Sequence, residues 1–76
     1  MKFFKRRKSI VIWIGVNKNG SISMHTVEPI KNEDLGIWMS NSPFVNSVIY
    51  NTFSNMIEKT PMNWESPAEP FEINMP

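Results

Sequence analysis

One segment, residues 9–27, constrains the fold more than any other part of the chain. Residues 9–16 are mostly apolar and rich in β-branched side chains, which favours a β-strand over a helix. Asn19 and Gly20 follow, and Asn-Gly is a strong hairpin signal because both residues tolerate the positive φ of a type I′ turn. Residues 21–27 then alternate in polarity. The sequence therefore predicts an antiparallel β-hairpin over 9–27, with a central first strand covered on both faces.

Shorter patterns outside this hairpin predict the remaining elements. Residues 35–39 are apolar around a tryptophan and residues 71–75 alternate, so both are typical of short strands, while the polar residues 31–34 predict a loop. Apolar side chains at helical spacing predict one amphipathic helix at about 44–58. Its Asn, Ser and Thr residues are poor helix formers, which leaves a strand at 46–50 followed by an irregular loop as the alternative.

The fold class that these elements predict is a small α+β domain. An antiparallel sheet of three to four strands, led by the hairpin, would pack against one helix. A chain of 76 residues allows at most one domain, so we expect a basic tail at 1–8 and a single domain at 9–76. The chain has no cysteine, which excludes disulfides and cysteine zinc sites. The expected core contains Ile10, Ile12, Ile14, Val16, Ile22, Met24, Trp38, Val48, Phe53, Ile57 and Ile73.

The net charge of +1 hides a strong asymmetry along the chain. After residue 8, three basic and seven acidic side chains give a net charge of −4. Five basic side chains lie within the first eight residues, interleaved with Phe3 and Phe4. Clustered basic residues bind phosphates and aromatic rings stack on bases, so a nucleic-acid-binding accessory protein is the alternative function. The tail residues that would make this contact are Lys2, Lys5, Arg6, Arg7 and Lys8.

The basic tail and the apolar residues 10–14 together have the outline of a secretory signal. The apolar run is at the short end for such a signal, Asn17 interrupts it, and no small-residue cleavage site follows. A membrane span would need about 20 apolar residues. The sequence therefore predicts a soluble, intracellular protein with no membrane partner.

Residue types that carry catalysis or bind metals are few. His25 is the only histidine, and the hydroxyl groups near it in the sequence occupy ordinary strand positions. We therefore expect a half-exposed strand histidine, and an enzyme that uses His25 as a base is the disfavoured alternative. One histidine without cysteine cannot form a typical transition-metal site, and the glycines do not form a phosphate-binding loop. The sequence predicts no enzymatic activity, no catalytic residues, no cofactor and no metal.

A chain without catalytic groups is expected to act by presenting a surface. Aromatic side chains are preferred anchors of protein interfaces, and the C-terminal half combines them with glutamates that suit a basic partner. We therefore predict a non-enzymatic protein-binding module. In the alternative, Trp64 packs on the sheet and the glutamates are solvated. Separately, an open sheet edge would allow self-association. The predicted partner-binding residues are Trp38, Tyr50, Trp64, Glu65, Glu69 and Glu72.

Two groups of residues together carry a resemblance. The first comprises Asn19-Gly20, Pro29 and Gly36-Ile37-Trp38, and the second runs from Met62-Asn63-Trp64-Glu65-Ser66-Pro67 to Phe71-Glu72-Ile73. In these features the chain resembles short uncharacterised proteins of bacteriophages and other mobile elements. The resemblance implies a phage-encoded protein in the cytoplasm of a bacterial host. It also implies binding to and inhibition of a host factor such as a defence nuclease complex, as anti-CRISPR and other anti-defence proteins do.

Overall fold

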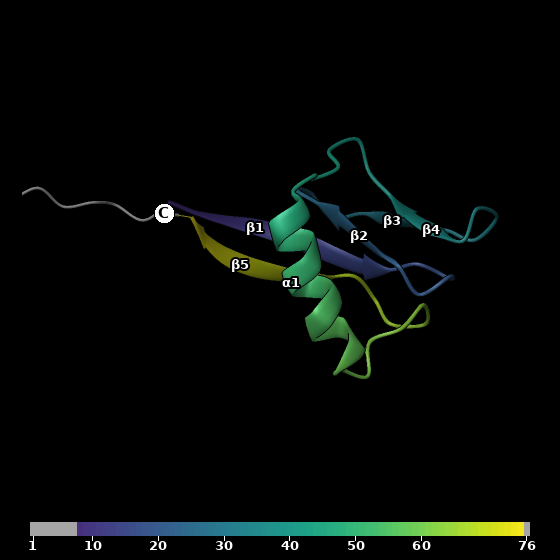
Figure 1. Cartoon of the computed structure of the whole chain (residues 1–76). Coiled ribbons are helices and arrows are strands. Elements are labelled where there is room, and N and C mark those ends of the chain that lie inside the picture. The colour runs from purple at the N-terminus through teal and green to yellow at the C-terminus, as the bar shows by residue number, and fades with distance from the viewer. Residues whose placement is uncertain (1–7, 76) are drawn as a thin grey trace, which may run out of the picture.

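A three-stranded antiparallel sheet forms the centre of the fold (Figure 1). The computed structural model describes residues 8–75. The long strand β1 (Lys8–Val16) lies between β2 (Ile22–His25) and β5 (Glu69–Met75). The predicted hairpin, the final strand and the central position of β1 are therefore confirmed.

The turn of the hairpin differs from the predicted type I′ turn. The Gly20 amide donates to the Asn17 carbonyl at 2.9 Å, and the Asn17 amide donates to the Ser21 carbonyl at 2.7 Å. Gly20 has a φ of +90°, whereas no non-glycine residue among those described has a positive φ. This combination is a type I turn followed by a glycine bulge. Asn19 therefore avoids the left-handed region, and its side-chain oxygen instead accepts a hydrogen bond from the Ser21 amide at 3.0 Å.

The predicted helix is present as α1 (Ser47–Glu58), and the alternative of a strand at 46–50 is excluded. It begins three residues later than expected because the Phe44 amide donates to the Met24 carbonyl at 2.9 Å, which keeps that segment extended beside β2. Asn46 then caps the helix, and its Oδ1 accepts from the Ile49 amide at 3.0 Å. No helix in the described part of the chain has the length and apolar character needed to cross a membrane.

The core lies between α1 and one face of the sheet, where α1 crosses β1 and β5 (Figure 1). Alternation along β1 places Ile12 and Ile14 on this face, and both are fully buried. Full burial of such a side chain contributes about 1.5–3 kcal/mol. Val48, which we expected in the core, is 73% exposed because it lies on the outer side of α1. The buried residues of this core are Ile12, Ile14, Val16, Ile22, Met24, Phe53 and Ile57.

A second hairpin, β3 (Ile30–Asn32) and β4 (Ile37–Met39), covers part of the other face of the sheet. The strand expected within 35–39 is thus confirmed, whereas part of the predicted loop at 31–34 belongs to β3. Trp38 lies directly over Gly15, and its indole Nε1 donates to the Val16 carbonyl at 3.1 Å. Val11, nearer the start of β1, is 47% exposed, so the expectation that both faces of β1 are covered is only partly met.

Candidate functional site

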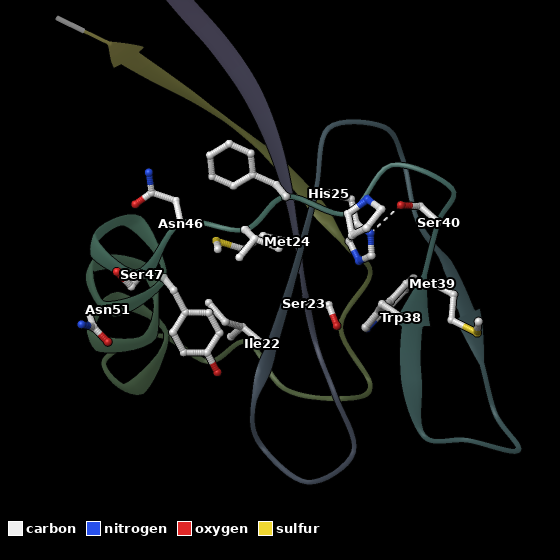
Figure 2. A pocket seen from close by; sticks show the side chains of 14 residues that line it. Ile22, Ser23, Met24, His25, Trp38, Met39, Ser40, Asn46, Ser47 and Asn51 are labelled. Atoms are coloured by element: carbon white, nitrogen blue, oxygen red, sulfur yellow. Dashed lines mark hydrogen bonds between the residues drawn. The ribbon is translucent and has the colours of Figure 1, made fainter.

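A groove with a volume of about 550 Å³ runs along the outer edge of β2 (Figure 2). The N-terminal half of α1 forms one wall, and β4 with the segment that follows it forms the other. None of the residues that line the groove is charged. The volume and the apolar lining are typical of ligand sites in proteins. The lining residues include Ile22, Met24, His25, Trp38, Met39 and Tyr50.

The groove exists because β2 has a partner strand on one side only. On its outer side, the Thr26 amide donates to the Ser42 carbonyl, and the Phe44 amide donates to the Met24 carbonyl, each at 2.9 Å. The chain then leaves β2 and enters α1, so this short ladder stops before it reaches Ile22. The edge of β2 therefore forms the floor of the groove.

Three large apolar side chains at the groove are exposed to solvent. Met39 is 43% exposed, Val45 is 90% exposed and Tyr50 is 36% exposed. Single exposed apolar residues are common on protein surfaces. These three share one uncharged groove, whereas five other large apolar side chains are exposed elsewhere on the described part of the chain.

His25 is part of the groove lining and is only 4% exposed, so the prediction of a half-exposed histidine is wrong. The segment after β4 covers it, and its Nδ1 forms a 2.6 Å hydrogen bond with Ser40 Oγ (Figure 2). Burial lowers the pKa of His25 from its ordinary value of 6.5, so the ring is neutral at pH 7. Its Nε2 has no hydrogen-bond partner among the described residues.

The His25–Ser40 pair has only part of the geometry that a nucleophilic site needs. A catalytic serine is activated by a base that a third group orients, but His25 Nε2 carries no such group. Ser40 Oγ instead accepts a hydrogen bond from the Ser42 amide at 3.1 Å and thereby shapes the turn after β4. The pair acts as a structural link between β2 and this turn.

Trp38 and Trp64, predicted as partner-binding residues, contact each other. Their ring centroids are 6.3 Å apart in an edge-to-face arrangement. Lys31 Nζ lies 4.2 Å from the Trp64 ring centroid and donates to the Trp64 carbonyl at 2.6 Å. Trp38 is only 9% exposed, so its expected burial is confirmed, but on the face of the sheet opposite the main core. It is not the exposed side chain that the partner-binding prediction assumed. This cluster fixes the loop that contains Trp64 to the β3–β4 hairpin.

The three glutamates of the predicted acidic surface do not lie together on one face of the sheet. Glu69 pairs with Ile14 on the helix-covered face, whereas Glu72 pairs with Val11 on the opposite face. Glu65 is exposed in the loop before β5. Of the six predicted partner-binding residues, Tyr50 and Trp38 line the groove.

The predicted nucleic-acid contacts Lys2, Lys5, Arg6 and Arg7 lie outside the described residues. Lys8, the fifth, is the first residue of β1. Within residues 8–75, no three His, Cys, Asp or Glu side chains come together in a way that could hold a metal ion.

Comparison of the chain with family models, with curated proteins and with solved structures finds no match. The resemblance to small bacteriophage proteins therefore stays a prediction from the sequence.

Proposed function

We propose that this chain is a non-enzymatic protein-binding module that holds its partner in the groove beside β2. The observation that carries the proposal is an uncharged, apolar groove flanked by the exposed side chains of Met39, Val45 and Tyr50. Interface centres are enriched in Met and Tyr and depleted of charged residues, which is the composition found here. Removal of this exposed apolar surface from water by a partner lowers the free energy and so favours binding.

The partner in this proposal is a protein of a bacterial host, and binding blocks its activity. The support for a host factor such as a defence nuclease complex is the resemblance of the sequence to small bacteriophage proteins. A chain of 76 residues inhibits most simply by covering a functional surface of the protein that it binds.

Two substitutions with the same chemistry test the groove. Val45→Asp places a charge at the groove in a side chain that is 90% exposed, and Val48→Asp places the same charge on α1 outside the groove in a side chain that is 73% exposed. The tagged protein and both variants are used to capture partners from a lysate of the host bacterium, with and without nuclease treatment. We expect a stoichiometric protein partner whose affinity falls at least about tenfold in Val45→Asp, because the charge must lose water on binding. The affinity of Val48→Asp should be unchanged.

Three results would contradict the proposal. Equal binding by Val45→Asp and the unmodified chain would place the interface elsewhere. Equal losses in Val45→Asp and Val48→Asp would point to an effect on α1 itself, which circular dichroism of both variants reveals. A partner that disappears after nuclease treatment would favour nucleic-acid binding in its place.

A further inference from the structure

We propose that the groove takes its partner as an extended, uncharged, apolar peptide segment that adds to β2 as a further antiparallel strand. This inference rests on the proposed function and specifies the chemistry of the partner. Strand addition supplies main-chain hydrogen bonds for affinity, while flanking pockets select alternate side chains.

The hydrogen bonding of β2 leaves backbone groups open on the groove side. The bond between the Asn17 amide and the Ser21 carbonyl fixes which residues of β2 face β1. Because backbone direction alternates along a strand, the amide and carbonyl of Ile22 and the amide of Met24 point away from β1. No hydrogen bond to another described residue occupies these three groups. Open groups on an edge strand are a template for pairing with another chain.

The outer edge of β2 already accepts one antiparallel partner. His25 and Pro43 form a β-bridge, and the Phe44 amide donates to the Met24 carbonyl. A peptide would continue this ladder toward Ile22 in the space that the chain leaves when it turns into α1.

The two walls match the alternation of an added strand. Figure 2 shows Asn46, Ser47 and Asn51 of the α1 side on one side of β2, and Trp38, Met39 and Ser40 on the other. Successive side chains of a strand point to opposite faces of the sheet. The added strand would therefore place one set of side chains against α1 and the next set against β4.

The uncharged lining determines which side chains the groove accepts. A charged side chain would lose part of its hydration there without gaining an opposite charge, which is unfavourable. His25 belongs to the same lining, but its Nε2 is buried, so the hydrogen-bonding side chains of the walls are those of residues such as Ser47 and Asn51. Uncharged β-branched and aromatic residues, with an occasional hydroxyl, fit this environment.

The test begins with an immobilised array of capped octapeptides composed of Val, Ile, Thr, Ser, Phe and Tyr. The best binder is then titrated into the full ¹⁵N-labelled chain, and amide hydrogen exchange is followed by NMR. We expect the exchange of the Ile22 and Met24 amides to slow by about tenfold or more at saturation, because each gains a hydrogen-bond acceptor. The amide of Lys18, which already donates to the Gly36 carbonyl, serves as the control and should not change.

A second measurement uses the peptide itself. N-methylation of its central residues should weaken binding by about tenfold, because it removes a main-chain donor, whereas N-methylation of a terminal residue should be tolerated. Val45→Asp should weaken binding of the same peptide, and Val48→Asp should not.

The outcomes separate this inference from the proposed function. A peptide that shifts groove resonances without protecting Ile22 and Met24, and that tolerates central N-methylation, overturns strand addition and supports a side-chain-only interface. Capture of a Val45-dependent protein partner with no binder in the array overturns the extended-peptide inference but supports the module. Failure of both experiments overturns both proposals.

Discussion

Gly15 determines where Trp38 can lie. A glycine inside a strand normally weakens it, because it contributes no side chain to packing. Here the missing side chain leaves the space that the indole of Trp38 fills, and the indole bonds to the Val16 carbonyl next to it. The β3–β4 hairpin can therefore approach the sheet closely enough to form a wall of the groove.

Gly15→Ala should destabilise the fold. The added Cβ would lie 2.4 Å from Cγ and Cδ1 of Trp38, so the ring must move. We expect a loss of about 1–3 kcal/mol in the free energy of unfolding, measured by urea denaturation, with a change in the near-ultraviolet circular dichroism of tryptophan. Gly20→Ala is the control: nothing lies within 4 Å of its added Cβ, but its φ of +90° is strained for alanine. It should cost about 1 kcal/mol without changing the tryptophan signal.

The stability of the protein should fall as the pH drops below the ordinary pKa of histidine. Burial lowers the pKa of His25 in the folded state, so between the folded and unfolded pKa values the unfolded chain binds more protons. The contribution of neutral His25 is therefore complete above pH 6.5 and is lost as the pH falls through the folded pKa. Urea denaturation from pH 7.5 to about 5.5 should show this decline. A His25→Gln variant should show a flatter profile, and an identical profile would assign the decline to other groups.

At the scale of the element, α1 depends on its cap because its own sequence is rich in Asn, Ser and Thr. Asn46→Ala should lower the free energy of unfolding by about 1 kcal/mol, because the Ile49 amide loses its acceptor. Asn55→Ala makes the same chemical change at an exposed position inside α1, where alanine is the better helix former. It should be neutral or raise stability by up to about 0.7 kcal/mol. Thermal unfolding of both variants, followed at the helical band, measures the difference, and equal effects would contradict the assigned cap.

The elements with a long, regular pattern could be predicted from the sequence. The first hairpin, β5 and α1 each carry a clear period or turn signal. β3 could not be predicted, because its three residues, Ile30 to Asn32, are too few to show alternation and two of them are polar. The start of α1 was missed because Phe44 is drawn into a β-ladder with Met24, a contact between segments distant in sequence.

Only a small part of the candidate site could be predicted. Its lining comes from β2, from β4 and from the start of α1, and no local pattern shows that these segments meet. The residue type alone indicates Tyr50, whereas Trp38 lines the groove as a buried side chain and not as the exposed aromatic residue that the sequence suggests. Val45 offered a weak signal, because it is an apolar residue in a polar, Asn-rich and Ser-rich segment.

At the scale of the whole molecule, the charge asymmetry predicts that the basic tail binds nucleic acid. Deletion of residues 1–7 removes Lys2, Lys5, Arg6 and Arg7 and leaves β1 complete. This deletion should abolish binding to a short DNA duplex. Fluorescence anisotropy measures the binding between roughly 50 and 200 mM salt, the range over which phosphate contacts weaken strongly. Lys59→Ser, an exposed cation just after α1, is the control and should bind like the unmodified chain. Binding that survives the deletion would exclude the tail as the contact.

The two outer edges of the sheet differ in their capacity to pair with another chain. The register places Ile14 opposite Glu69 and Trp13 opposite Pro70. The backbone of Pro70 therefore points away from β1, where its missing N–H blunts the outer edge of β5, and the exposed Glu72 adds a charge to the same edge. Self-association through β5 is disfavoured, which leaves β2 as the more open edge.

The position of β1 between β2, the next strand in the chain, and β5, the last one, also affects the order in which the sheet folds. β2 can pair with β1 as soon as the short turn between them closes, but β5 follows every other element in chain order. Closing so long a loop is entropically costly and slows folding. During synthesis on the ribosome, β1 therefore keeps one unpaired edge until β5 emerges. A nascent chain that stalls before β5 exposes the apolar strand around Ile12 and becomes a substrate for chaperones or for aggregation.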